Sequence, residues 1–172
     1  MRDEISTLTV PGKEHTLFIS ARPGFASPSP SREIPGFIEN IREIGVKTVT
    51  VLMPDYELFD DYGKNLLVEY RKAGLAVLHC PILDFSVPET ITGPGGFGEC
   101  IDALWNALSE GNVLVHCAAG MGRSGLAAAC LLVRAGLTPD DAVTRVRRAR
   151  SGTIQTREQE DFVHRFEKGL SE

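Results

Sequence analysis

The sequence predicts a single α/β domain whose sheet is mostly parallel. A length of 172 residues fits one domain. Short apolar runs rich in β-branched residues alternate with amphipathic helical patterns, and Gly45 and Gly74 end the first two helices just before a strand. Strand–helix–strand units of this kind form parallel sheets with right-handed crossovers, and their ligands bind at the carboxyl ends of the strands. A functional site is therefore expected at that edge of the sheet.

The amino-terminal half is expected to begin with a hairpin at the edge of the sheet and to continue as alternating helices and strands. Pro11, Gly12 and Lys13 separate the two strands of the hairpin, and Pro35 suits the first position of a helix. In chain order the expected elements are strands at 7–10 and 15–20, a proline-rich loop at 21–33, a helix from 35 to 45, a strand at 46–53, a helix at 62–73 and a strand at 75–80.

In the carboxyl-terminal half, a long loop is followed by helices and one more strand. Residues 81–98 are rich in glycine and proline and form this loop, which runs into the start of the next helix. Apolar residues at intervals of three and four predict a helix over 97–109 that packs on the core. The elements expected after it are a strand at 113–115, a loop at 118–123, a nearly apolar helix at 124–136, a helix at 138–150 capped by Thr138, and a last helix that starts at a capping box of Thr156 and Gln159.

The segment between the strand at 113–115 and the following helix predicts a phosphate-binding loop. Gly120 and Gly122 permit backbone angles that let successive N–H groups point at one centre. The positive end of the helix attracts a dianion, and the Arg123 guanidinium can hold two phosphate oxygens at once. Cys117 stands at the start of this loop, directly after the strand.

Cys117 is predicted to be a nucleophile. The field that attracts phosphate also favours the thiolate form of a cysteine beneath it, and a thiolate can attack a bound phosphorus atom. His116 is expected to fix the loop through a hydrogen bond, and the Ser124 hydroxyl to donate to the sulfur as it leaves. Two other interpretations remain, because buried cysteines are often inert core residues and glycine-rich turns also bind nucleotides.

Asp84, which follows the strand at 75–80, is a candidate general acid. In its neutral form it can protonate the departing oxygen of a phosphate ester, which is otherwise a poor leaving group. An aspartate that caps a turn is the alternative interpretation. Asp55, Asp60 and Asp61 are rival acids, because they follow the strand at 46–53.

HCAAGMGRSG resembles the His-Cys-x5-Arg-Ser signature of the cysteine-dependent protein tyrosine and dual-specificity phosphatases. LDFSVP, which contains Asp84, is similar to the general-acid loop of these enzymes. IQT followed by Gln159 is similar to their glutamine loop. The resemblance implies that Gln155 positions the water that hydrolyses the phosphoenzyme. Gln159 is the weaker candidate, because the capping box already explains it.

From residue 17 to residue 170 the chain is similar to the kinase-associated phosphatase (cyclin-dependent kinase inhibitor 3) family. The order of elements carries this resemblance together with GVKTVTVLMPDYEL, TPDDAV and SGTIQTREQ. It implies an α/β phosphatase fold over one domain of residues 1–172, which needs no cofactor or metal and acts on phosphorylated proteins. Ala118 and Ala119 stand where close relatives often carry glycine.

The predicted site has a catalytic and a substrate-binding set. The catalytic residues are Cys117, Arg123, Asp84, Ser124 and Gln155. The substrate-binding residues are His116, Ala118, Ala119, Gly120, Met121, Gly122 and Gln159. In this prediction the cysteine attacks phosphorus, the arginine and loop amides stabilise the equatorial oxygens, and the aspartate protonates the leaving oxygen.

The expected function is a protein phosphatase that hydrolyses phosphotyrosine, and also phosphoserine and phosphothreonine, through a cysteinyl phosphate. The chain has no long insertion before its first parallel strand to wall a deep phosphotyrosine cleft, which favours a shallow site. A phosphatase of phosphoinositides or RNA 5′-phosphates and a phosphate-binding module without chemistry are the alternatives. The uncharged Ala118 and Met121 favour a singly phosphorylated side chain.

Composition indicates a cytoplasmic protein that binds neither nucleic acid nor membrane, and a monomer is expected. The net charge of −5 argues against nucleic acid as a partner. No apolar run approaches the roughly 18 residues of a membrane span, and the first ten residues lack a signal-peptide core. The four cysteines show no disulfide or metal-ligand spacing, which suits a reducing compartment. Cys80 is nevertheless a candidate for a disulfide with Cys117 under oxidation.

The roles of Arg22 and of four arginines near the end of the helix at 138–150 are left open by the sequence. Arg22, in the proline-rich loop, either lines a pocket or is solvated. Four arginines crowd the last turns of the helix at 138–150, where they form either a solvated basic face or a surface that attracts an acidic partner. They are Arg145, Arg147, Arg148 and Arg150.

Overall fold

A computed structural model describes residues 4–59 and 63–169 of the chain. These residues form a five-stranded sheet with the order β1-β2-β5-β3-β4. The strands are β1 (Ser6–Thr9), β2 (Thr16–Ser20), β3 (Val46–Val51), β4 (Ala76–His79) and β5 (Asn112–His116). β1 and β2 pair as an antiparallel hairpin, whereas β2, β5, β3 and β4 are parallel. The mostly parallel sheet with a hairpin at its edge is therefore confirmed.

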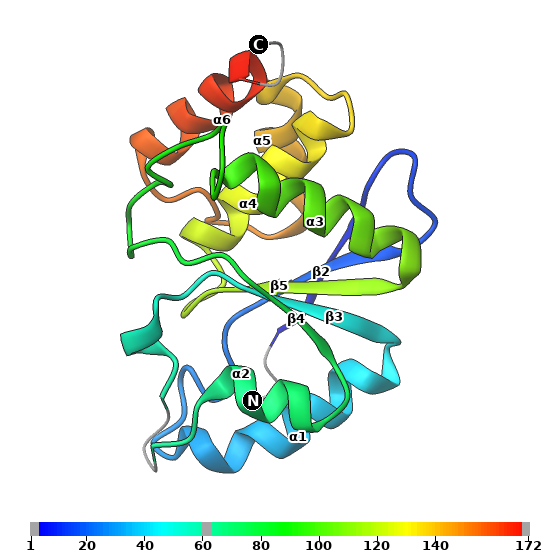
Figure 1. Cartoon of the computed structure of the whole chain (residues 1–172), viewed down its shortest axis with the longest axis vertical. Coiled ribbons are helices and arrows are strands. Elements are labelled where there is room, and N and C mark those ends of the chain that lie inside the picture. Colours follow the sequence, from blue (N-terminus) through cyan, green and yellow to red (C-terminus); the bar gives the residue numbers. More distant parts are fainter. Residues whose placement is uncertain (1–3, 60–62, 170–172) are drawn as a thin grey trace.

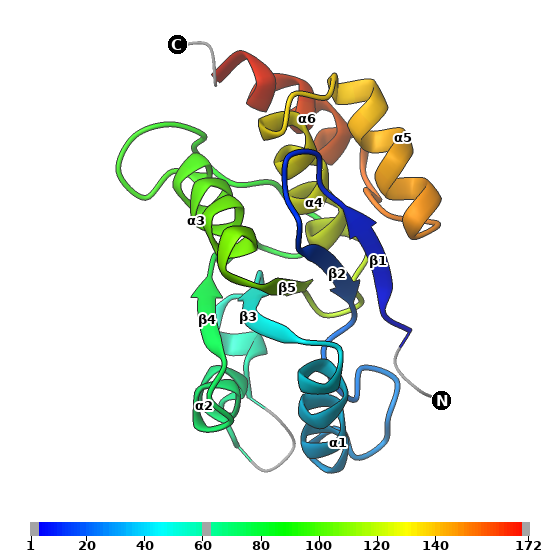
Figure 2. The ribbon, with the colours of Figure 1, turned by 90° about the vertical axis from the view of Figure 1, so that its right-hand side faces the viewer.

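Helices cover both faces of the sheet (Figure 1 and Figure 2). One face carries α1 (Pro30–Glu43) and α2 (Leu66–Lys72). The other carries α3 (Phe97–Glu110), α4 (Gly122–Arg134), α5 (Pro139–Ala149) and α6 (Arg157–Gly169). α3 and α4 both contact β5, the middle strand of the sheet, so the core lies along this strand.

α4 is the most deeply buried helix, as its apolar sequence predicts. Every residue from Gly122 to Val133 is buried, and the helix packs against α3, α5 and α6. A helix that is apolar on all sides has no stripe to turn towards solvent, so it takes the centre of the layer. Neither α4 nor any other helix in the described residues is long and apolar enough to cross a bilayer.

The start of α1 differs from the prediction. The helix begins at Pro30, so Pro35 lies inside it and the predicted loop at 21–33 ends earlier. Pro30 takes the first helical position, where a missing N–H is harmless. Pro35 removes a single hydrogen bond, while the helix buries the apolar side chains of Ile34, Phe37 and Ile41. Burial of this face outweighs the lost bond, and the helix extends towards the amino terminus.

Other boundaries shift by smaller amounts. β3 ends at Val51, two residues before the predicted end of the strand at 53. α2 begins at Leu66 because the Asn65 side chain accepts hydrogen bonds from the first amides of the helix. Residue 62, where this helix was predicted to begin, lies outside the described residues. The predicted caps at Thr138 and Thr156 are confirmed by the bonds that their hydroxyls accept.

The prediction of no disulfide is wrong. Cys80, just after β4, is joined to Cys100 in the first turn of α3, with their Cα atoms 6.2 Å apart. The candidate disulfide between Cys80 and Cys117 is therefore also wrong, and Cys117 is a free thiol. Spacing gave no signal because the two partners are 20 residues apart, and only the fold brings the end of β4 beside α3.

Candidate active site

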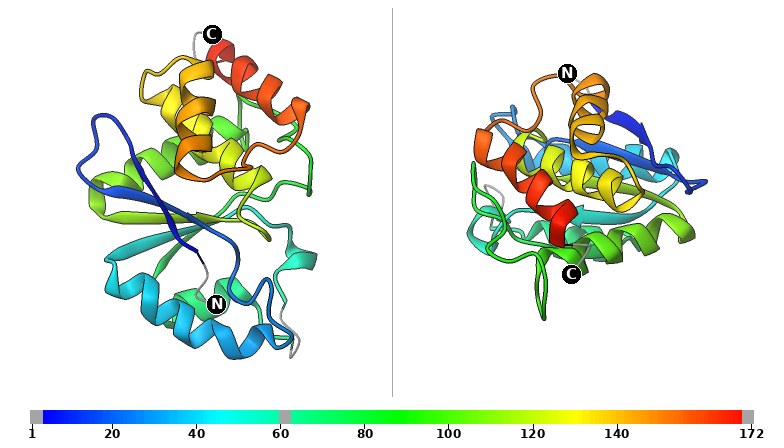
Figure 3. Two further views of the ribbon diagram at one scale, coloured as in Figure 1. Left: turned by 180° about the vertical axis from the view of Figure 1, so that it is seen from behind. Right: turned by 90° about the horizontal axis from the view of Figure 1, so that it is seen from above.

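The loops that follow β3, β4 and β5 meet at the carboxyl edge of the sheet. Figure 1 and Figure 3 show the loop after β4 and the short helix η1 (Asp55–Glu57), which follows β3, on the same side as the segment between β5 and α4. We name residues 117–123 the cradle and residues 81–96 the acid loop. Strand order places β5, and therefore the cradle, at the centre of this edge.

Several backbone carbonyl groups of the cradle accept hydrogen bonds from the surrounding protein. The bonds to neighbouring segments are Arg22 N to Ala118 O (2.9 Å), Arg150 Nε to Gly120 O (2.8 Å) and Ile154 N to Met121 O (3.3 Å). By contrast, the amide groups of residues 118–121 donate to no backbone carbonyl of the described residues. A loop whose carbonyls are bonded elsewhere and whose amides are free is an anion-binding site.

Glycine is required at two positions of the cradle. Gly120 has a φ of +70°, and a Cβ there would overlap the backbone of Ser20. A Cβ at Gly122 would lie 2.9 Å from the side-chain oxygen of Gln155 and 3.0 Å from the side-chain nitrogen of Gln159. The first glycine therefore lets the cradle turn against the end of β2, and the second lets the two glutamines approach it.

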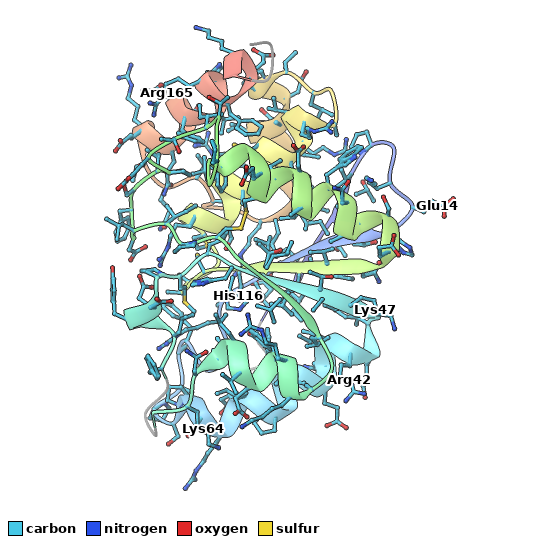
Figure 4. The ribbon with its side chains drawn as sticks, in the orientation of Figure 1. Glu14, Arg42, Lys47, Lys64, His116 and Arg165 are labelled. Atoms are coloured by element: carbon cyan, nitrogen blue, oxygen red, sulfur yellow. A yellow bond between two sulfur atoms is a disulfide. The ribbon has the colours of Figure 1, made fainter. Side chains whose placement is uncertain are left out.

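His116, the last residue of β5, is fully buried under the cradle, near the middle of the molecule (Figure 4). Its Nδ1 lies 3.0 Å from the Cys117 carbonyl oxygen and its Nε2 lies 2.9 Å from the Tyr70 hydroxyl. Burial lowers the pKa of His116 to about 4, so the ring is neutral at neutral pH. A carbonyl only accepts, so Nδ1 carries the hydrogen and Nε2 accepts from Tyr70. This pair of bonds fixes the peptide group of Cys117, as expected for His116.

Arg123 is almost completely buried in the first turn of α4. Its Nη1 and Nη2 donate to the two carboxylate oxygens of Glu57 at 2.9 and 3.0 Å, and Nη1 also donates to the Ile82 carbonyl at 3.0 Å. Burial by itself lowers the pKa of a guanidinium, but the hydrogen bonds that Arg123 donates to Glu57 and the nearby negative charges raise the pKa of Arg123 above its usual value. The guanidinium is therefore charged, and the two-pronged pair fixes its plane.

Asp84 lies beside Arg123. Its Oδ1 is 3.1 Å from Arg123 Nη2 and accepts a hydrogen bond from Phe85 N at 3.1 Å, while the side chain remains 53% exposed. Phe85 has a φ of +56°, which is unusual for a residue with a side chain. The rival Asp55 points into solvent, 4.0 Å from His79 Nδ1 and 90% exposed. Asp60 and Asp61 lie outside the described residues.

Cys117, the first residue of the cradle, and Ser124, the residue directly after it, are both buried. Cys117 is the first residue after β5 and is a free thiol. The Ser124 hydroxyl is buried and has no hydrogen-bond partner in the part of the chain that the structure describes. A buried hydroxyl without a partner is uncommon, and it leaves a donor available to a thiolate or to a ligand.

Gln155 and Gln159 both reach the cradle but differ in their bonds. Gln159 is fully buried; its oxygen accepts from the amides of Gln155 (2.9 Å) and Thr156 (3.3 Å), and its nitrogen donates to the Ser86 carbonyl at 3.2 Å. It therefore ties the last helix to the acid loop. Gln155 is exposed, and its side chain has no hydrogen-bond partner among the described residues. The side-chain amide of Gln155 is free to hold a water molecule beside the cradle.

Comparison with known proteins identifies the family. A protein-family model described as "Polymorphic toxin system, DSP-PTPase phosphatase" matches residues 23–137. Cyclin-dependent kinase inhibitor 3 of Rattus norvegicus is 33% identical over 159 residues, which cover 90% of this chain and 73% of the relative. The chain belongs to the dual-specificity phosphatase family.

Solved structures of phosphatases have the same fold. A crystal structure of kinase associated phosphatase, in which a serine replaces the catalytic-site cysteine, matches with a TM-score of 0.83 and 27% identity, covering 99% of this chain and 97% of that one. Tk-PTP in its active form matches with a TM-score of 0.73 and 32% identity, covering 95% and 97%. The predicted phosphatase fold, family and protein phosphatase activity are confirmed, and the chain is a cysteine-dependent phosphatase.

Glu57 is the residue of the phosphatase site that the sequence did not reveal. It lies in the same acidic segment as Asp55, and nothing in the local spacing separates the two. The available signal was topological, because β3 neighbours β5 and the residues after β3 must therefore lie near the cradle. Among the described residues, no group of three His, Cys, Asp or Glu side chains is arranged to hold a metal ion.

Two of the four arginines, Arg147 in α5 and Arg150 directly after it, bind carbonyl groups of the phosphatase itself. Arg150 donates to the Gly120 carbonyl of the cradle and, at 2.9 Å, to the Glu4 carbonyl. Arg147 donates to the Thr153 and Ile154 carbonyls at 3.2 and 3.1 Å. The interpretation of these two side chains as part of a solvated basic face is therefore wrong. They hold the segment before α6 against the cradle.

Proposed function

We propose that residues 1–172 form one catalytic domain that hydrolyses phosphotyrosine and also phosphoserine and phosphothreonine in proteins. The observation that carries this proposal is the placement of a free Cys117 at the base of a cradle with unbonded amides, with Asp84 3.1 Å from the Arg123 guanidinium above it. A module that only binds phosphate needs neither a thiol nor an acid at this position.

In the first step the Cys117 thiolate attacks phosphorus. The cradle amides and Arg123 bind the equatorial oxygens, where charge accumulates. The sulfur–phosphorus bond forms as the bond from phosphorus to the substrate oxygen breaks. Asp84 gives its proton to that oxygen, so the product leaves as a neutral hydroxyl group and Asp84 becomes a carboxylate.

In the second step water releases the phosphate. Gln155 orients a water molecule, and the Asp84 carboxylate takes a proton from it as its oxygen attacks phosphorus. The sulfur–phosphorus bond breaks and the thiolate is regenerated, with the Ser124 hydroxyl donating to it. Asp84 ends the cycle with its proton restored, and inorganic phosphate leaves with the one remaining proton of the water.

The loops around the cradle support a shallow site. The segment between β2 and α1 covers only residues 21–29, and the side chain of Asp84 is about half exposed. A deep cleft that accepts only the long phosphotyrosine side chain needs a higher wall than these loops supply. Shorter phosphoserine and phosphothreonine side chains therefore also reach Cys117.

The test is turnover of p-nitrophenyl phosphate in the presence of a metal chelator, followed by a panel of peptides that differ only in phosphoserine, phosphothreonine or phosphotyrosine. We expect turnover of all of them and, after acid quenching, a phosphate trapped on Cys117. Cys117→Ser lowers kcat by about 10⁴-fold or more. Cys130→Ala, at the other buried free cysteine, is the matched control and retains activity. Turnover that survives in Cys117→Ser contradicts the proposal.

A further inference from the structure

Arg22 lies beside the cradle with its charge unpaired. Its amide donates to the Ala118 carbonyl at 2.9 Å, which fixes its backbone next to the phosphate-binding loop. Its side chain is half-buried, and no ion pair in the described residues involves it. The buried Nε has no hydrogen-bond partner, and Nη1 reaches only the Glu57 carbonyl at 3.4 Å. Such a guanidinium has donors left for an anion that comes from outside the chain.

Glu57 brings Arg22 and Arg123 together. The carboxylate of Glu57 holds Arg123, and its backbone carbonyl lies against Arg22. Both guanidinium charges also act on the ring of His116 under the cradle and lower its pKa. The site therefore carries two neighbouring guanidinium groups. Arg123 is neutralised by a carboxylate, whereas Arg22 is not.

We propose that Arg22 binds a second anionic group of a peptide substrate, an acidic or phosphorylated side chain next to the phosphorylated residue. The proposal rests on the proposed function and names the class of peptide that this site prefers. While the cradle and Arg123 hold the phosphate to be cleaved, the fork of Arg22 receives a carboxylate or phosphate of the neighbouring residue.

The surface around the cradle favours a peptide over a lipid headgroup as the carrier of this second anion. Phe25, Tyr56 and Phe85 stand on the loops after β2, β3 and β4, at the edge that holds the cradle, and are 48%, 70% and 59% exposed. These side chains offer apolar contact to the residues of a bound segment. The net charge of −5, in contrast, opposes approach to an anionic membrane surface.

The experiment compares phosphotyrosine peptides that carry Asn, Asp, Ser or phosphoserine at the neighbouring position. Three proteins are assayed: the wild type, Arg22→Gln and Arg22→Lys. Arg32→Gln, at an exposed arginine of α1, is the matched control. For the wild type we expect KM to be about tenfold lower with Asp than with Asn, and lower again with phosphoserine than with Ser. The comparison of Asp with Asn tests for binding of a carboxylate, and the comparison of phosphoserine with Ser tests for binding of a phosphate.

Arg22→Gln is expected to remove this preference by raising KM for the acidic peptides about tenfold, with a smaller change for p-nitrophenyl phosphate. Arg22→Lys keeps the charge without the fork and restores part of the preference. Equal losses of kcat with every substrate in Arg22→Gln overturn the proposal, because Arg22 then acts only by positioning Glu57. So does a wild type that does not distinguish Asp from Asn, or a dependence on Arg22 seen only with phosphoinositide headgroups.

Failure of the proposed function gives a different result. If the wild type hydrolyses p-nitrophenyl phosphate but none of the peptides, the assignment of phosphoproteins as substrates is wrong, and the Arg22 proposal falls with it. If the wild type hydrolyses the peptides but without any preference for acidic neighbours, only the Arg22 proposal is wrong.

Discussion

The cradle and the acid loop serve the same reaction in the proposed mechanism, but they are held in different ways. The cradle joins a central strand to the most buried helix, and Cys117, Arg123 and Ser124 are all buried. The acid loop contains neither helix nor strand, and its Leu83 and Phe85 are exposed. It is held by the Arg123 contacts to Ile82 and Asp84, by Gln159 and by the disulfide between Cys80 and Cys100, which flank it.

This difference follows from what each region must do. In the proposed mechanism the cradle stabilises charge, which requires donors that are fixed before the substrate arrives. The proposed mechanism requires the acid loop to place one proton on the leaving oxygen while substrate and product pass, which suits a loop that lies at the surface and is tied at a few points. Changes in the cradle should therefore affect every substrate, and changes in the acid loop should affect mainly substrates whose leaving group needs a proton.

Of the changes suggested by this contrast, a substitution at Asp84 should have the largest effect on activity. Asp84→Asn removes the proton donor, so kcat/KM for a phosphotyrosine peptide should fall about 10³-fold. An ester with a strongly acidic leaving group needs little protonation and should lose far less activity. Steady-state kinetics on both substrates measure the difference. Asp55→Asn, at the exposed rival carboxylate, is the control. Equal losses on the two substrates would show that Asp84 is not the acid.

Removing the disulfide tests whether a bond outside the cradle holds the acid loop in place. Its partners are 20 residues apart, so removing the bond should lower the free energy of unfolding by about 3 kcal/mol. Urea unfolding of Cys80→Ser, Cys100→Ser and the double variant measures this effect. Each single variant already breaks the bond, so the double variant should lose little more than either one.

A dithiol reductant should destabilise the wild type and leave the double variant unchanged. Because the bond closes the loop that carries Asp84, its loss should also lower activity more on the poor leaving group than on the good one. Additive losses in the two single variants, or equal loss of activity on both substrates, would contradict this account.

The two regions also differ in how far the sequence predicts them. The determinants of the cradle are adjacent in the chain: an apolar strand, Cys117, two glycines, Arg123 and an apolar helix. Such a pattern is visible without knowledge of the fold. The acid loop depends on partners from elsewhere. Asp84 is predicted because it follows a strand and because LDFSVP is similar to a general-acid loop. The Cys80–Cys100 bond and the contact of Glu57 with Arg123, in contrast, arise only when β4, α3 and η1 are brought together.

His116 makes the stability of the cradle depend on pH. The pKa of His116 is about 4 in the folded protein, against 6.5 for an unperturbed histidine. Below pH 6.5 the unfolded chain binds a proton that the folded chain excludes, so stability is lost as the pH falls from 6.5 towards 4 and is fully present above 6.5. Between pH 7 and pH 5 this loss amounts to about 2 kcal/mol.

Urea unfolding at the two pH values measures the loss in the wild type and in His116→Gln. The variant should lack this component, because glutamine does not titrate. His164→Gln, at a partly exposed histidine of α6, should retain it. Equal pH dependence in the wild type and His116→Gln would mean that other groups cause the loss.

The smallest expected effect is at Glu57, which lies outside the cradle but orients its arginine. Glu57→Gln keeps one acceptor oxygen for Arg123 and removes the charge, so kcat/KM should fall about tenfold. The loss should be the same for good and poor leaving groups, because Arg123 stabilises the phosphoryl group whatever the leaving group is. This pattern is the opposite of that expected for Asp84→Asn, and Glu39→Gln in α1 is the control. A loss confined to poor leaving groups would mean that Glu57 acts on Asp84 instead. The cradle would then hold Arg123 in place without the contact from η1.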